Sequence, residues 1–370
     1  MSPRSGSAPR SSSEYRFPAE WETHEATWIG WPHNTTDWPG KFAPIPWVYG
    51  EIVRQLARGE TVRVLVNSAS HQQRAARVLK DVGADLARVH FFQVPTDRGW
   101  TRDFGPIFLR QKVESRRHSE GRLVIAGFRF NGWAKYRNHK LDARVARQLA
   151  RRLRLSFLPV KVGRREIVVE GGAIDVNGCG TVLTTEECLL DPDVQTRNPG
   201  LARNELEQVF AQYLGAPNTL WLGRGITGDD THGHVDDLCR FVSPRTMVLC
   251  REPDSSDANY RPLEENWDRV QDFRLEDGSK PETVPLPMPA PVYFQGRRLP
   301  ASYANFYICN AAVLVPTFND PNDRIALGVL AEVVAGRPVI GIHAVDLVWG
   351  LGTLHCLTQQ QPEKATMNSE

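Results

Sequence analysis

Cys356 follows a glycine-rich run near the end of the chain, GLGTLHCLTQQQP at residues 350–362. Glycine lets a backbone approach a ligand closely, so a thiol that follows Gly350 and Gly352 is placed for exposure. A cysteine is nucleophilic as its thiolate, which needs a nearby cation or a general base. In an extended run the His355 side chain points away from that of Cys356, so His355 is not the expected base. The alternative for Cys356 is a buried structural thiol, the usual fate of a free cysteine.

The segment GDDTHGHVDD, residues 228–237, holds two histidines and four aspartates. In an extended run, His232, His234 and Asp236 share one face. One interpretation is a zinc site, because the run resembles the His-x-His-x-Asp-His motif of binuclear zinc hydrolases, although Asp237 replaces the last histidine. The other interpretation makes His234 a general base and Asp236 a carboxylate that binds a cationic substrate.

Three acids, Asp103, Glu170 and Asp236, favour the cationic substrate. Converging carboxylates repel one another, and a metal ion or a cationic substrate relieves that repulsion. A planar guanidinium suits carboxylates, because its N–H groups match them in fork geometry. Its carbon is an electrophile, and its positive charge stabilises a nearby thiolate such as that of Cys356.

A repeated pattern explains how residues so far apart in sequence meet. Five segments at near-regular intervals each place a polar residue among small residues before a β-like apolar run, around Asp103, Glu170, Asp236, Asn305 and Cys356. Such a period indicates repeated supersecondary units packed against each other. Five units around one axis would aim five polar groups at a common centre.

Helical and strand patterns alternate along the chain, which predicts an α/β fold. Apolar residues at helical spacing predict helices at 47–58 and 323–335, each followed by a glycine. The segments 61–67 and 338–345 are typical of strands. Residues 251–290 are rich in Pro, Asp and Glu and are predicted to form a long, partly irregular connection.

No change of composition divides the chain into independent domains. We therefore expect a disordered tail at residues 1–13 and a single catalytic domain at 14–370. The polar stretch at 111–122 is expected to be an exposed loop or hairpin tip.

Composition and charge exclude several classes of protein. Lys and Arg number 45 against 43 Asp and Glu, a net charge of +2, which is no nucleic-acid footprint. No apolar stretch approaches the length of a membrane span. The six cysteines contain no Cys-x-x-Cys pair, so they predict neither a structural zinc site nor a disulfide framework and indicate a reducing, cytoplasmic compartment. A homo-oligomer is left open.

Several long motifs stand in an order typical of one enzyme family: FPAEWETHEATWIGWP, WTRDFGP, EGGAIDVNGCGTVLTTEECLL, RNPG, GHVDD, SYANFYICN and LHCLTQQQP. From about residue 17 to residue 362, the sequence resembles the agmatine deiminase family of Porphyromonas-type peptidylarginine deiminases. The wider group includes arginine deiminases and amidinotransferases. The resemblance implies a five-bladed α/β propeller, the pentein fold, of ββαβ units around a central active site.

The resemblance also implies roles for individual residues. Cys356, in LHCLTQQQP, matches the nucleophile, and His234, in GHVDD, matches the general acid/base. Asp103, in WTRDFGP, and Asp236, in GHVDD, match the carboxylates that bind the guanidinium. Glu170, in EGG, matches the acid beside the histidine.

Two further residues are assigned to substrate binding. Asn305 lies in the SYANFYICN motif, and Trp100, together with Trp133, would wall the aliphatic stem of the substrate. The chain departs from the family where Leu351 interrupts the glycine run and where residues 131–138 replace a Trp-Gly-Gly segment. These departures leave the matched catalytic groups in place and concern the expected substrate entrance.

We predict a cytoplasmic hydrolase of polyamine metabolism that converts agmatine and water to N-carbamoylputrescine and ammonia through a covalent amidino-cysteine. It needs no metal or organic cofactor, and its expected partner is a small cationic guanidino substrate rather than a nucleic acid or a membrane. Three alternatives stay open. They are another guanidino substrate such as arginine or peptidyl-arginine, a guanidinium-binding module without turnover, and a zinc hydrolase that uses His232, His234 and Asp236.

Overall fold

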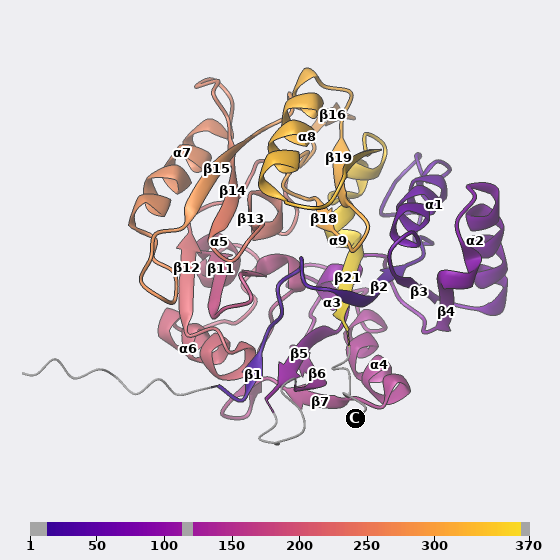
Figure 1. The fold of residues 1–370 in the computed structure, drawn as a ribbon, viewed down its shortest axis with the longest axis horizontal. Helices are drawn as coiled ribbons and strands as arrows, with labels where there is room; N and C mark the ends of the chain where they lie inside the picture. Colours follow the sequence, from indigo (N-terminus) through magenta and orange to yellow (C-terminus); the bar gives the residue numbers. More distant parts are fainter. Residues whose placement is uncertain (1–12, 113–120, 364–370) are drawn as a thin grey trace, which may run out of the picture.

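The computed structural model describes residues 13–112 and 121–363. The predicted tail, except for its last residue, and most of the loop predicted at 111–122 lie outside the described residues. Within them, the strands form five sheets of three or four strands and two short hairpins, and helices connect the strands. The fold is therefore mixed α/β, as predicted (Figure 1).

The sheets are built from strands that are mostly short. The first contains β21 (Thr358–Pro362), β2 (His24–Gly30), β3 (Thr61–Val66) and β4 (Val89–Gln93). The second contains β1 (Tyr15–Arg16), β5 (Ile107–Gln111), β6 (Arg122–Gly127) and β7 (Ser156–Pro159). The third contains β10 (Asp175–Val176), β11 (Thr181–Thr185) and β12 (Asn218–Leu222), and the fourth β13 (Cys239–Phe241), β14 (Thr246–Arg251) and β15 (Glu282–Pro287). The fifth contains β18 (Tyr307–Ile308), β19 (Val313–Thr317) and β20 (Val339–His343). The hairpins are β8 (Lys161–Val162) with β9 (Arg165–Glu166), and β16 (Tyr293–Phe294) with β17 (Arg297–Arg298).

All five sheets contain an antiparallel pair followed by a parallel strand. Parallel neighbours need a crossover connection, which is usually a helix. The helices at these crossovers are α1 (Ile45–Leu56), α2 (Ala69–Asp81), α4 (Val145–Leu153), α5 (Glu186–Leu190), α6 (Arg203–Val209), α7 (Tyr260–Arg269) and α8 (Pro321–Val333).

The predicted elements form where apolar spacing was regular. On α1 the buried residues include Ile45, Tyr49, Ile52 and Leu56, a helical stripe that begins two residues before the prediction. The helix predicted at 323–335 is α8, which begins at Pro321 after its Asp320 cap.

The connection predicted at 251–290 is more regular than expected. It contains α7, which buries only Leu263 and Asn266, and β15, which pairs in parallel with β14. A helix with so narrow a buried face has a weak apolar pattern in its sequence. Pro285 and Pro287 argue against a strand in the sequence, although β15 contains both.

In four sheets a short helical turn leads directly into a strand of an antiparallel pair. These turns are α3 (Thr101–Phe104) before β5, η3 (Gly171–Ala173) before β10, η5 (Val235–Asp237) before β13 and α9 (Leu354–Leu357) before β21. The turn α3 contacts α9 and η3, and η3 contacts η5. Segments far apart in sequence therefore meet at these turns, which carry or adjoin the predicted site residues.

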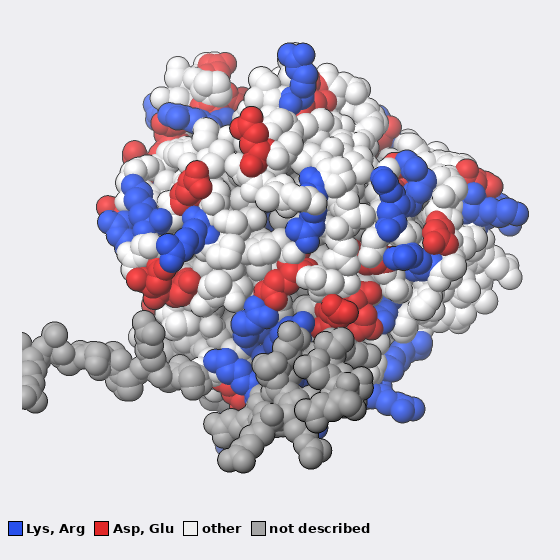
Figure 2. Space-filling model, in the orientation of Figure 1, with Lys and Arg blue, Asp and Glu red and all other residues white. Residues whose placement is uncertain are grey.

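The surface carries no large region of one charge on the face viewed in Figure 2, where Lys and Arg are interspersed with Asp and Glu. Among the helices of the described residues, none combines the length and the apolar character that a membrane span requires.

Candidate active site

The turn that carries Cys356 is one turn of helix, α9, rather than the extended run predicted. Cys356 is 7% exposed. A Cβ atom at Gly352 would lie 3.1 Å from the Cys356 sulfur and 3.0 Å from the Trp100 ring. Glycine at this position is therefore what allows the tryptophan and the thiol to lie so close to the backbone.

Asn305 organises this turn. Its Oδ1 accepts from the Thr353 hydroxyl at 2.8 Å and from the His355 backbone N–H at 3.1 Å. Its Nδ2 donates to the Cys356 sulfur at 3.1 Å and to Asp237 at 2.9 Å. Both amide hydrogens are thus engaged behind the thiol, which favours a positioning role over the substrate contact predicted from the sequence.

Asp103 lies on α3, and two hydrogen bonds orient its carboxylate. Its Oδ2 accepts from the Trp133 indole at 2.9 Å, and its Oδ1 accepts from the Gly172 backbone at 3.0 Å. Burial raises the pKa of Asp103 to about 6, with a further rise from Asp236 and an opposing effect of His234.

Asp236, on η5, lies close to the Cys356 thiol. Its Oδ2 lies 3.7 Å from the Cys356 sulfur and 2.6 Å from His355 Nδ1. Burial alone would raise the pKa of Asp236, but His355 lowers it below its usual range. The other ring nitrogen of His355 lies 2.8 Å from Glu20, so both nitrogens are engaged and His355 is not placed as the base. Oδ1 of Asp236 is buried without a hydrogen-bond partner in the described structure, which leaves it available to a donor.

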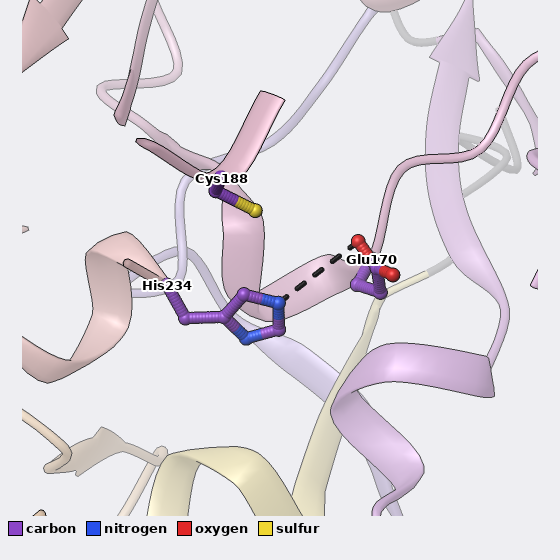
Figure 3. Close-up of side chains that lie close together, drawn as sticks. All are labelled: Glu170, Cys188 and His234. Carbon is purple, nitrogen blue, oxygen red and sulfur yellow. Dashed lines mark ion pairs between the residues drawn. The ribbon is translucent and has the colours of Figure 1, made fainter. Parts of the chain in front are cut away.

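His234 has an acid near each of its ring nitrogens, and Figure 3 shows the ring beside one of them, Glu170, and near Cys188. Its Nδ1 is 3.8 Å from Asp103 Oδ1, and its Nε2 is 3.9 Å from Glu170 Oε2. The ring is buried, and neither nitrogen makes a hydrogen bond to a described residue. Burial would lower the pKa of His234, but Asp103 and then Cys188 and Glu170 raise it well above its ordinary value. These acids therefore favour the protonated imidazole, which can donate a proton.

Glu170 is held by Arg197, the first residue of the RNPG motif, to which the sequence assigns no role. Arg197 Nε donates to Glu170 Oε1 at 3.2 Å, and both side chains are fully buried. Burial would raise the pKa of Glu170, but Arg197, with His234, lowers it to about 2. Cys188 completes this group, with its sulfur within 4.8 Å of Glu170 and His234. Its place beside Glu170 and His234 could not be predicted from the sequence, because the contact is tertiary.

The surroundings of the thiol disfavour its ionised form. Burial, then Asp236, Asp237 and Asp103, raises the pKa of Cys356 well above its ordinary value. No cation among these neighbours offsets the acids, so a thiolate forms here when a positive charge enters beside it.

A cavity of about 310 Å³ leads to the thiol. Trp100, Asp103 and Cys356 line it, as does Trp133, which was expected to wall the substrate stem. The other predicted residues are buried and do not line the cavity: Glu170, His234, Asp236 and Asn305. The cavity continues outward along residues that include Asp37, Arg98, Asp230 and Arg297.

The zinc trio is not assembled. The run 228–237 is not extended, because His232 and Gly233 have φ values of +55° and +86° and the η5 turn follows. Among the described residues, the groups with metal-ligating atoms close together are Glu170 with Cys188 and His234, and Asp236 with Asp237 and Cys356; neither includes His232. The side chain of His232 is 39% exposed and lies 3.8 Å from Glu187 instead.

Comparison with known proteins finds one family along nearly the whole chain. The model of the Porphyromonas-type peptidyl-arginine deiminase family matches residues 16–362. An agmatine deiminase of Medicago truncatula is 34% identical over 375 aligned positions, which cover 94% of this chain and 96% of that protein.

Solved structures agree. An agmatine deiminase of C. jejuni with substrate bound has a TM-score of 0.82 and 29% identity, and the match covers 95% of this chain and 97% of that one. An agmatine deiminase of Enterococcus faecalis has a TM-score of 0.84 and 27% identity, with 95% and 97% covered.

Proposed function

The chain belongs to the Porphyromonas-type peptidyl-arginine deiminase family, and we propose that it hydrolyses agmatine to N-carbamoylputrescine and ammonia. One observation carries the proposal. A buried thiol, Cys356, lies 3.7 Å from the Asp236 carboxylate at the end of a cavity that Asp103 also lines. Two carboxylates beside a thiol suit a substrate whose reacting carbon lies within a cation.

The first half of the reaction forms the covalent intermediate. The guanidinium binds between Asp103 and Asp236, its charge lowers the pKa of the adjacent thiol, and the thiol releases its proton to solvent. The Cys356 sulfur attacks the guanidinium carbon and forms a C–S bond. The protonated ring of His234 gives its proton to the departing nitrogen, the C–N bond breaks, and ammonia leaves an amidino-thioether.

The second half releases the product. The neutral imidazole of His234 now accepts a proton from water, which attacks the amidino carbon. The C–S bond breaks with its electron pair on sulfur, the hydroxyl of the tetrahedral adduct gives its proton to the Cys356 thiolate, and the neutral ureido product leaves. Glu170, held ionised by Arg197, faces the imidazole and stabilises it whenever it carries a proton.

The test is ammonia release from agmatine, free arginine and short arginyl peptides at equal concentrations. We expect agmatine to give the highest kcat/KM. Turnover of arginine or a peptide without turnover of agmatine would refute the proposed substrate and support the proposed reaction. Absence of turnover on every guanidino compound would refute the reaction.

One observation favours arginine as the second candidate. Arg297 lines the outer cavity, and its side chain is 46% exposed. A substrate carboxylate could bind there, whereas the amine of agmatine would be repelled. Asp230 lies 3.1 Å from Arg297 and offsets its charge, which is why agmatine comes first.

We propose further that the five sheets are arranged as a five-bladed α/β propeller. The shared strand pattern and the contacts between α3, α9, η3 and η5 support this arrangement. A reducing, cytoplasmic compartment is proposed from the cysteines, since all six are free.

A further inference from the structure

A second hollow, of about 670 Å³, lies apart from the cavity that leads to Cys356, and the two share no lining residue. The hairpin of β8 and β9 forms one side of it, and residues 196–199 contribute to another. Its charged lining consists of five basic residues and one acid: Arg129, Lys161, Arg164, Arg165, Arg197 and Glu166.

Most of these cations lack an acidic partner. Arg129, Lys161 and Arg164 are exposed and form no ion pair with an acid of the described residues. Arg165 donates to the Pro199 carbonyl at 2.7 Å, which orients its guanidinium without neutralising it. Because a concave surface concentrates the field of the charges around it, the hollow attracts anions although the whole chain carries a net charge of only +2.

The wall of the hollow is connected to the catalytic acid. The inner side of residues 196–199 carries Arg197, whose buried guanidinium donates to Glu170 at 3.2 Å and to the Thr231 carbonyl at 2.6 Å. The Asn198 side chain donates to the Val168 carbonyl at 2.7 Å and accepts from its N–H at 3.0 Å. Both sets of contacts lead to Glu170. Arg197 contacts Glu170 directly, and Val168 precedes Glu170 by two residues in the chain.

We propose that this hollow binds a small multivalent phosphate anion, and that the bound anion slows turnover by pulling residues 196–199, and Arg197 with them, away from Glu170. Guanidinium groups bind phosphate oxygens in pairs, and several cations around one hollow favour more than one phosphate. Of the described residues that line it, only Val168 and Pro199 are apolar, so it offers no aromatic wall to a nucleobase. The site goes beyond the proposed function, and only its kinetic consequence rests on that function.

Binding is tested by calorimetry with inorganic pyrophosphate at constant ionic strength. The test variant is Lys161→Gln with Arg164→Gln, and the matched control is Arg77→Gln with Lys80→Gln, which removes two exposed cations from α2. We expect the wild type and the control to bind one pyrophosphate per chain. The test variant should bind at least about tenfold more weakly, because hydrogen bonds to charged groups are lost. No binding by the wild type, or equal weakening in both variants, overturns the site.

The effect on catalysis is tested by agmatine turnover with and without pyrophosphate, against sodium chloride at matched ionic strength. We expect kcat to fall about fivefold, a modest coupling between separate sites, with KM unchanged. The Lys161 and Arg164 variant should keep its basal kcat and lose this inhibition. A raised KM at constant kcat would place the anion in the substrate cavity and overturn the proposal, as would binding without any change in kcat or equal inhibition by chloride. Pyrophosphate binding by a protein that turns over no guanidino compound would support the site and refute the proposed function.

Discussion

Replacing Asp103 with asparagine removes one charge from the centre of the site and keeps the size of the side chain. In the free protein this carboxylate is buried near Asp236 and Glu170, and its pKa is raised to about 6. At neutral pH it is therefore ionised at a cost in stability, and a bound guanidinium relieves that cost. The substitution should consequently act in opposite directions on turnover and on stability.

The two magnitudes follow from separate comparisons. Removing one partner of a buried charge pair costs about 2–5 kcal/mol, which is about thirtyfold to several thousandfold in agmatine turnover. A pKa raised from 3.8 to about 6 on folding costs about 3 kcal/mol above pH 6. The native state binds the proton more tightly than the unfolded state, so this loss of stability develops as pH rises from about 4 to 6. Asp103→Asn removes the loss and weakens the Trp133 indole contact, worth about 1 kcal/mol, so a net gain of about 2 kcal/mol remains at pH 7.

Three assays check the prediction: ammonia release from agmatine, thermal unfolding at pH 4 and pH 7, and alkylation of Cys356 by neutral iodoacetamide. Asp103 is one of the charges that, after burial, raise the pKa of the Cys356 thiol, so alkylation should become faster in the variant. Asp81→Asn, at an exposed position on α2, is the control and should change none of the three. Near-normal turnover, or lower stability at pH 7, would refute the reasoning.

Four further predictions follow from the same geometry. Cys356→Ser should be inactive, and mass spectrometry of wild-type enzyme quenched during turnover should find the amidino adduct on Cys356; an adduct on another cysteine would overturn the mechanism. Asn305→Ala should lower kcat and leave KM nearly unchanged, because the Asn305 amide positions the turn that carries Cys356 and does not line the cavity. A change in KM alone would instead indicate that Asn305 contacts the substrate. The kcat/KM for agmatine should rise with pH through about 6 as Asp103 ionises, and a profile that is flat there would show that Asp103 need not be charged. Full activity should survive exhaustive chelation, and activity that disappears and returns with zinc would favour the metal hydrolase.

The repeated polar positions were predictable because the fold repeats. Asp103, Asp236 and Cys356 each lie on a short helical turn that leads into a strand of an antiparallel pair, so an approximate spacing in sequence reflects an equivalence in space. Asn305 stands two residues before β18 in the same way. The α/β class followed from the same alternation of apolar patterns.

The conformations of the turns were not predictable from that spacing. The zinc interpretation assumed an extended run, whereas His232 adopts a left-handed conformation that its residue type does not require. The partner of each charge was also unpredictable. Arg197 and Glu170 are 27 residues apart, and the choice of this arginine depends on a tertiary contact rather than on any local pattern.

The charges of the site explain both how the reaction starts and how it ends. In the proposed mechanism, burial and then the nearby acids raise the pKa of Cys356 in the free protein, and an arriving cation lowers it. The positive charge of the substrate therefore activates the thiol that attacks it, whereas a neutral urea has no charge with which to do so. Hydrolysis converts the guanidinium into a neutral ureido group, which removes the attraction to Asp103 and Asp236. The same two carboxylates thus favour binding of the substrate, ionisation of the thiol and departure of the product, because the reaction destroys the charge that they recognise.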